Sequence, residues 1–123
     1  MRFEKLQEIA YSLLDKRDSR CFHVAFILKK KRIVSIGWNK SSTHPLIKKY
    51  NYQPFAKTHA ELAAVIKLGE VDCSNLDLAV LRINKNDKID SSKPCSGCAH
   101  MIKQLNFKNV YYTSSDGDWL QGV

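Results

Sequence analysis

The spacing of apolar residues along the chain predicts three amphipathic helices. From residue 3 to about residue 16, apolar side chains return every three or four positions, as they do on one face of a helix. A second helix is expected to open within residues 56–68 and to end near Gly69, because glycine readily takes the left-handed conformation of a C-terminal cap. The third is expected within residues 93–105, with Pro94 in its first turn, where proline is well tolerated. Its inward face is marked at helical spacing by Cys98, Met101, Ile102 and Leu105.

Runs of β-forming residues between these helices predict four strands. Residues 22–28 and 33–38 are separated by the basic turn "KKKR" and are typical of a hairpin. Residues 76–83 and 109–115 have the apolar density of buried strands and alternate with the second and third helices. This order predicts an α/β fold, a three-layer α/β/α sandwich whose mixed sheet starts with an N-terminal β-hairpin and whose last two strands run parallel through a right-handed crossover. The polar segments between these elements are predicted to be loops, at residues 39–57 and 84–93.

Length and composition indicate one ordinary globular domain over residues 1–123. Hydrophobic residues make up 44% and charged residues 26% of the chain, and no stretch of about 18 apolar residues is present to span a membrane. The opening "MRFEKLQEIA" is charged and amphipathic rather than signal-like, so we expect a cytoplasmic protein without membrane contact. The net charge of +8 favours anionic partners such as phosphates.

The four cysteines separate into two kinds. Without an export signal they are expected to be thiols or metal ligands, not disulfides. Cys21 and Cys73 have no motif around them and are expected to be small buried residues. Cys95 and Cys98 stand three apart at the start of a predicted helix, where the helix N-terminus stabilises thiolates. This spacing occurs in redox pairs and in zinc sites, but the order of elements lacks the thioredoxin-like context that a redox pair would need.

His59 and Glu61, at the start of the second helix, allow two interpretations. Thr58 and Glu61 fit a capping box, in which Glu61 bonds only to the backbone. Alternatively, His59 joins Cys95 and Cys98 as a zinc ligand, which leaves the fourth tetrahedral position open, as in catalytic sites. In the first turn of a helix, His59 and Glu61 can both reach a centre that lies off the helix end.

The segments "HAE" at residues 59–61 and "PCSGC" at residues 94–98 together resemble the H-x-E…P-C-x-x-C signature of the zinc-dependent cytidine and deoxycytidylate deaminase superfamily. The similarity extends over roughly residues 22–115. It implies that Zn²⁺ is held by His59, Cys95 and Cys98, and that Glu61 is the proton shuttle. A purely structural zinc site, completed by Cys73 or His100, is the alternative.

The resemblance also implies substrate contacts outside the signature. Asn39 in "GWN" corresponds to an asparagine that binds the substrate sugar or ring in relatives, although a strand-end turn residue is the simpler interpretation. The backbone N–H of Ala60 would contact the ring carbonyl. Lys48 and Lys49 lie among aromatic residues in the long loop, and they either bind the substrate phosphate or are simply solvated. The remaining histidines are expected to be structural or solvated, namely His23, His44 and His100.

Two departures from the family are visible. "GWNKSSTHP" replaces the glycine-rich "GYNG"-like turn of relatives with allosteric control, so nucleotide regulation is not expected. Relatives usually continue through another helix and often a fifth strand, so the fold is expected to be C-terminally shortened, with an open sheet edge that self-association would cover. Trp119 would either fold back over the pocket or belong to a frayed tail.

The resulting hypothesis is hydrolytic deamination of cytosine to uracil in a free (deoxy)cytidine nucleoside or nucleotide, with release of ammonia. Adenine and guanine rings remain open as substrates. A second hypothesis is an editing deaminase that acts on a base flipped out of single-stranded DNA or RNA. A third is a zinc-stabilised binding module without catalysis. Glu61 distinguishes the third from the others, because a structural site needs no uncommitted carboxylate.

Overall fold

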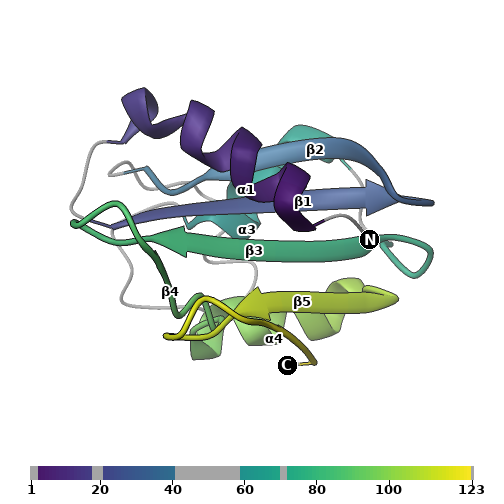
Figure 1. Cartoon of the computed structure of the whole chain (residues 1–123). Coiled ribbons are helices and arrows are strands. Elements are labelled where there is room, and N and C mark those ends of the chain that lie inside the picture. The colour runs from purple at the N-terminus through teal and green to yellow at the C-terminus, as the bar shows by residue number, and fades with distance from the viewer. Residues whose placement is uncertain (1–2, 18–20, 41–58, 70–71, 123) are drawn as a thin grey trace.

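A mixed sheet lies between two layers of helices, with α1 in front of it and α3 and α4 behind it (Figure 1). The computed structural model describes residues 3–17, 21–40, 59–69 and 72–122. The helices are α1 (Phe3–Ser12), the 3₁₀ turn η1 (Leu14–Lys16), α3 (Ala60–Leu68) and α4 (Ser96–Leu105). The strands are β1 (Phe22–Lys29), β2 (Arg32–Trp38), β3 (Asp77–Ile83), β4 (Ile89–Asp90), β5 (Asn109–Thr113) and β6 (Trp119–Gln121). This arrangement confirms the predicted three-layer sandwich.

The strand order is β2-β1-β3-β5-β6, and β4 pairs with β3 beside this path. β3 and β5 run parallel, as predicted, and the other pairs are antiparallel. The hairpin between β1 and β2 is tighter than the sequence suggested, because Lys30 and Lys31 alone form its turn, with φ angles of 50° and 68°. Two successive positive φ angles are the mark of the type I′ turn, which matches the twist of the strands that it joins.

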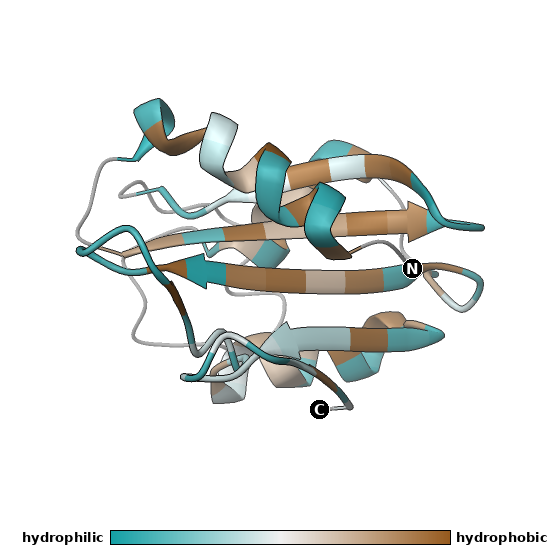
Figure 2. Ribbon diagram, in the orientation of Figure 1, coloured by the Kyte–Doolittle hydropathy of each residue, from teal (hydrophilic) through white to brown (hydrophobic). Residues whose placement is uncertain are grey.

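Alternating side chains on the central strands divide the core into two apolar clusters. Phe22, Val24 and Phe26 of β1 face α1, whereas Ala25 and Ile27 face α3 and α4. Figure 2 shows the resulting apolar strands at the centre of the molecule, with polar residues concentrated in the turns.

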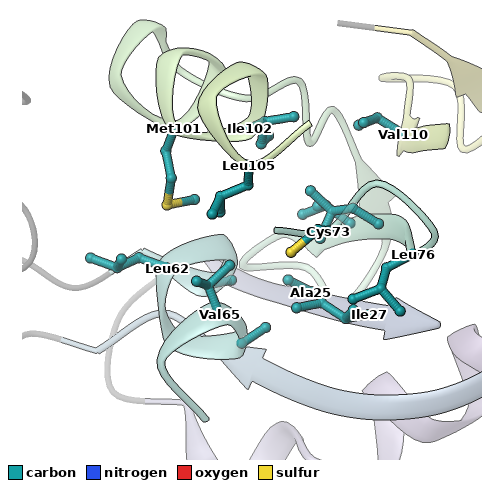
Figure 3. Close-up of a cluster of buried hydrophobic side chains, with 14 residues drawn as sticks. Ala25, Ile27, Leu62, Val65, Cys73, Leu76, Met101, Ile102, Leu105 and Val110 are labelled. Atoms are coloured by element: carbon teal, nitrogen blue, oxygen red, sulfur yellow. The ribbon is translucent and has the colours of Figure 1, made fainter. Parts of the chain in front are cut away.

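The apolar cluster on the α3 and α4 side of the sheet joins these two helices. In Figure 3, Met101 and Leu105 of α4 point toward Leu62 and Val65 of α3, and all four side chains are nearly inaccessible to solvent. Cys73 lies in the same cluster, as the sequence analysis expected. Because α3 and α4 pack on each other and on one face of the sheet, their N-terminal ends are held close together.

Two short strands were not predicted. β4 has only two residues, too few to show a periodic pattern, and it lies in the segment that we expected to be an irregular loop. β6 pairs with β5 and so occupies the sheet edge that was expected to be open. The prediction of an open edge at β5 was therefore wrong, and self-association, which was inferred from it, stays a prediction without that support. Within the described residues, no helix is long and apolar enough to cross a membrane.

Trp119 lies on the α1 face of the sheet. Its ring stacks on Phe3, with ring centroids 4.4 Å apart and an interplanar angle of 14°. Both earlier expectations for this residue were wrong, because it neither covers the α3–α4 face nor belongs to a frayed tail. The aromatic contact with the first helix fixes its position.

Gly37 in β2 sets how closely α3 approaches the sheet. A Cβ at this position would lie 2.3 Å from the backbone nitrogen of Ala64 and 2.6 Å from the carbonyl oxygen of Ala60. Nearby, the buried Ser35 hydroxyl donates a 2.7 Å hydrogen bond to the Ala64 carbonyl. The helix therefore rests directly on the strand, with no room for a side chain between them.

We expect Gly37→Ala to lower the free energy of unfolding by about 1–3 kcal/mol or more, because the added methyl group would meet helix backbone and not a flexible side chain. Zinc affinity should also fall, because α3 would be displaced. Val34→Ala on the same strand is the control, since Val34 is 44% exposed, and it should cost less than about 1 kcal/mol. Chemical denaturation measures both effects, and a Gly37→Ala protein as stable as the wild type would contradict this packing.

Candidate metal centre

Three side chains from two helix starts converge at one point. His59 is the N-cap residue of α3, with φ −81° and ψ 157°, and Cys95 is the N-cap residue of α4, with φ −67° and ψ 170°. The Nδ1 atom of His59 lies 3.6 Å from Sγ of Cys95 and 3.4 Å from Sγ of Cys98. All three candidate ligand atoms lie within 4.8 Å of one another.

These distances fit a tetrahedral zinc site. With Zn–S bonds of about 2.3 Å and a Zn–N bond of about 2.0–2.1 Å, tetrahedral geometry separates a nitrogen from a sulfur ligand by about 3.6 Å. Across the described parts of the chain, neither Cys73 nor His100 joins this group of ligand atoms. The set therefore has three protein ligands, and the alternative of a structural site completed by Cys73 or His100 finds no support.

Local backbone structure explains why Cys95 and Cys98 face the centre. The Cys95 sulfur accepts a 3.5 Å hydrogen bond from the backbone N–H of Cys98, which caps the start of α4. Pro94 was predicted to occupy the first turn, but it precedes the N-cap, so the helix begins later than expected. The N–H groups at this helix start favour negative charge on both sulfurs.

The segment that carries Cys95 is fixed to the sheet by a buried hydroxyl network. Ser92 Oγ donates a 2.7 Å hydrogen bond to the Val80 carbonyl and accepts a 2.7 Å bond from the backbone N–H of Thr113. Thr113 Oγ1 in turn donates to the Asp90 carbonyl at 2.7 Å. The segment that precedes Cys95 is thereby hydrogen-bonded to both β3 and β5, and these bonds help to position the Cys95 sulfur.

Glu61 lies in the first turn of α3 and is only 5% exposed. Burial raises the pKa of Glu61 to about 6, and interaction with its own backbone N–H and with His59 opposes this rise. A hydrogen bond to Cys95 and burial raise the pKa of the Cys98 thiol, and Glu61 adds to that effect. Acidic groups this close disfavour one another's ionisation, so a divalent cation would stabilise the deprotonated set.

The structure also bears on the capping-box interpretation of Glu61. A capping box built from Thr58 and Glu61 would make Thr58 the N-cap residue, whereas the N-cap residue of α3 is His59, one position later. Thr58 itself lies outside the described residues. His59 and Cys98 both influence the pKa of Glu61, so its carboxyl group lies close to these two candidate ligands.

Of the predicted substrate-binding residues, the structure describes Asn39 and Ala60. Asn39 Oδ1 accepts a 2.9 Å hydrogen bond from the backbone N–H of His23, and its Nδ2 donates a 3.0 Å bond to the Cys21 carbonyl. The Asn39 amide thus holds the start of β1, and its substrate role stays a prediction. Ala60 is the first residue of α3, where backbone N–H groups lack intrahelical partners, and its contact to a ring carbonyl also stays a prediction. Three other residues lie outside the described part of the chain: Lys48, Lys49 and His44.

The sequence analysis did not place His23 and Arg82 near the metal centre. His23 in β1 pairs with Arg82 in β3, and alternation puts both on the face that α3 and α4 cover. Burial, Arg82 and His59 lower the pKa of His23 to about 4. The face of His23 could have been predicted from the sequence, because His23 alternates in step with Ala25 and Ile27 along β1. The pairing of β1 with β3, which brings Arg82 next to His23, could not.

Comparison with known proteins adds independent support. A family model, the cytidine and deoxycytidylate deaminase zinc-binding region, matches residues 2–114. No curated protein sequence matches the chain.

The fold of the chain is also similar to those of solved protein structures. The chain is similar to a cytidine deaminase from Burkholderia pseudomallei, with 20% identity, a TM-score of 0.64, and coverage of 99% of this chain and 92% of that one. It is also similar to the dCMP deaminase of cyanophage S-TIM5 in its apo form, with 20% identity, a TM-score of 0.59, and coverage of 90% and 81%. The same phage enzyme in complex with dCMP and dUMP gives 19% identity, a TM-score of 0.59, and coverage of 91% and 80%. At these identities the likeness shows the fold.

We expect Cys95→Ala or Cys98→Ala to lose stoichiometric zinc and to lower the free energy of unfolding by about 3 kcal/mol or more, because metal binding contributes to folding. Elemental analysis and thermal unfolding measure both effects. Cys73→Ala is the matched control, since Cys73 is fully buried in the apolar cluster; it should lose stability and keep its zinc. Full zinc occupancy in the Cys95→Ala protein would contradict the ligand assignment.

Proposed function

Because the chain belongs to the cytidine and deoxycytidylate deaminase zinc-binding family, whose members are zinc-dependent hydrolytic deaminases, we propose that it converts cytosine to uracil in a free nucleoside or nucleotide and releases ammonia. The observation that carries this proposal is the buried carboxyl group of Glu61 beside a centre of one histidine and two cysteines. Three protein ligands leave a position where water can react, and a structural zinc site would need neither that position nor the carboxyl group.

In this proposal, the residues of the chain position the reaction and move its protons. When bound by His59, Cys95 and Cys98, zinc supplies the Lewis acidity that makes water nucleophilic near neutral pH. The Glu61 carboxylate accepts a proton from the attacking water and delivers it to N3 of the ring, next to the carbon that bears the amino group. The Glu61 carboxylate then takes the remaining proton from the attacking oxygen and donates it to the amino group, which leaves as ammonia while the new carbonyl forms. Burial of Glu61 keeps bulk water away from this transfer.

A free nucleotide is the favoured substrate class. The similar solved proteins are a cytidine deaminase and a dCMP deaminase, and the latter was solved with dCMP and dUMP. The net charge of +8 favours a substrate with a phosphate over an uncharged nucleoside. The specific substrate that we propose is therefore a cytosine nucleotide of the dCMP type.

Single-stranded nucleic acid is the second candidate substrate. Such substrates are bound by open aromatic faces on which bases stack, next to cations. Trp38 on β2 is a half-buried tryptophan beside cations, but the Lys67 ammonium lies 4.1 Å from its ring centroid and also donates a 3.0 Å hydrogen bond to the Ile36 carbonyl. Lys67 lies over the Trp38 ring, and Trp38 also packs against the apolar cluster between the sheet and α1. We therefore do not count this tryptophan as an open surface for base stacking. We keep nucleic acid as an outcome of the test.

Ammonia release from cytidine, dCMP, dCTP, adenosine and single-stranded DNA is the experiment that tests the function. We expect turnover of dCMP by the zinc-loaded protein and a loss of at least about 100-fold in kcat for Glu61→Ala, which removes the proton carrier. Zinc content and fold should not change in this variant. Glu4→Ala, an exposed glutamate in the first turn of α1, is the matched control and should keep full activity.

Two results would contradict the proposal. Turnover by Glu61→Ala comparable to that of the wild type would remove the catalytic role of Glu61. Ammonia release from single-stranded DNA alone would replace the free nucleotide with the editing alternative.

A further inference from the structure

The hairpin between β1 and β2 carries four successive cations at its tip, and we propose that this tip is a contact surface for the phosphate backbone of a nucleic acid. The residues are Lys29, Lys30, Lys31 and Arg32, all exposed, and they are called the basic turn below. This inference goes beyond the proposed function, because the basic turn is not part of the metal centre.

The basic turn lies at the end of the sheet where β3 and β5 begin (Figure 1). Leu28, just before the turn, pairs with Asp77 at the start of β3. α4 starts at the metal centre and ends near the start of β3, where the Leu105 carbonyl accepts a 2.8 Å hydrogen bond from the Cys73 N–H. Since α4 has ten residues at about 1.5 Å each, roughly 15 Å of helix separates the zinc ligands from this end of the sheet.

Strand register extends the positive charge beyond the turn. Lys29 pairs with Arg32 across the hairpin. The antiparallel register of β1 and β3 brings Lys29 level with Leu76, and the N–H of the exposed Lys108 donates a 2.9 Å hydrogen bond to the Leu76 carbonyl. Neighbouring strands lie about 4.8 Å apart, so Arg32, Lys29 and Lys108 form a row of about 15 Å across the sheet end. Such a row is complementary to a linear run of phosphates.

Carboxylates in the described residues do not neutralise this row. The ion pair closer than 4.0 Å among them joins Arg17 to Asp87, in another part of the molecule. At the sheet end, Asp77 accepts a 2.9 Å hydrogen bond from the Asn109 amide, and Asp72 accepts a 3.0 Å bond from a nearby backbone N–H. Like charges directly opposite one another on paired strands are destabilising. The basic turn therefore lowers the stability of the hairpin, and an external anion would relieve the repulsion.

The backbone of the turn gives a second, independent reason to infer a ligand. Lys30 and Lys31 have φ angles of 50° and 68°, in the left-handed region. Two-residue hairpin turns of this kind favour Asn-Gly, because glycine adopts positive φ without steric strain and asparagine tolerates it. Strained residues that persist in a fold mark functional sites. The property that two lysines supply here and Asn-Gly lacks is positive charge.

A nucleic-acid backbone fits the basic turn better than a membrane surface does. Segments that lie on membranes combine cations with large exposed apolar side chains. Of such side chains among the described residues, Val34 lies near the turn, whereas Tyr11 and Leu120 belong to α1 and β6. The turn itself is hydrophilic throughout (Figure 2). Phosphate contacts of nucleic acids need cations alone, and they do not depend on base sequence.

Binding of a fluorescently labelled DNA duplex of about 20 base pairs, followed by anisotropy from about 50 to about 200 mM NaCl, tests this inference. Bases paired in a duplex are not presented to the metal centre. We expect Lys30→Asn with Lys31→Gly to weaken binding at least about tenfold at the lowest salt. The slope of log Kd against log salt should fall by about 2, since each phosphate contact contributes about 0.9. The same variant should melt at an equal or higher temperature, because its turn is less strained.

Two control variants separate the turn from net charge. Lys85→Asn with Lys88→Asn removes the same charge from exposed positions between β3 and β4, and it should keep the affinity within about twofold. Lys30→Arg with Lys31→Arg keeps the charge and should keep the binding. Turnover of dCMP should be the same in all these variants and in the wild type, so failure of the deaminase proposal and failure of this inference are separate results.

Three results would overturn the inference. A wild type that does not bind the duplex at the lowest salt would leave the basic turn as a solvated surface. Equal weakening by the two neutralising pairs would show an effect of net charge alone. Tighter binding to phosphatidylserine vesicles than to the duplex, lost in Lys30→Asn with Lys31→Gly, would assign the turn to a membrane surface instead.

Discussion

The starts of α3 and α4 are held at one point, and the metal centre depends on this constraint. Neither helix could bind a metal alone, because α3 supplies one ligand and α4 supplies two. Their packing on each other through Met101, Leu105, Leu62 and Val65 sets the separation (Figure 3). The close contact of α3 with Gly37 sets its depth over the sheet. Displacing either helix would move its ligand atoms away from those of the other, so the stability of the apolar cluster and the metal affinity are linked.

The sheet extends this constraint to the segment before Cys95. Ser92 and Thr113 connect that segment to β3 and β5 through buried hydrogen bonds, which are strong where water is excluded. The buried hydroxyls of Ser92 and Thr113 each have a hydrogen-bond partner and hold the segment that leads to Cys95. Among the described residues, two buried N–H groups lack such a partner, Nε of Arg82 and Nε1 of Trp119.

Much of the site could be predicted from the sequence because its ligands lie within two short motifs at helix starts. The helices and the four long strands followed from periodicity, the parallel β3–β5 pair followed from the order of elements, and the zinc ligands followed from the resemblance of the two motifs to the deaminase signature. The short strands could not be predicted, since β4 and β6 depend on pairing partners and not on a local pattern. For the same reason the sequence did not bring His23 and Arg82 to the site, because their proximity is a property of register between β1 and β3. Trp119 was misplaced because its contact is with Phe3, more than a hundred residues away in the chain.

The central claim is that one nitrogen and two sulfur ligands of this chain hold zinc and leave one position open. X-ray absorption at the zinc edge of the loaded protein measures this directly. The account predicts two sulfur ligands at about 2.3 Å and two nitrogen or oxygen ligands at about 2.0–2.1 Å, one of which exchanges with solvent. The same spectrum is expected for Glu61→Ala, because that residue is not a ligand. A shell of three or four sulfurs, or of nitrogen and oxygen alone, would contradict it.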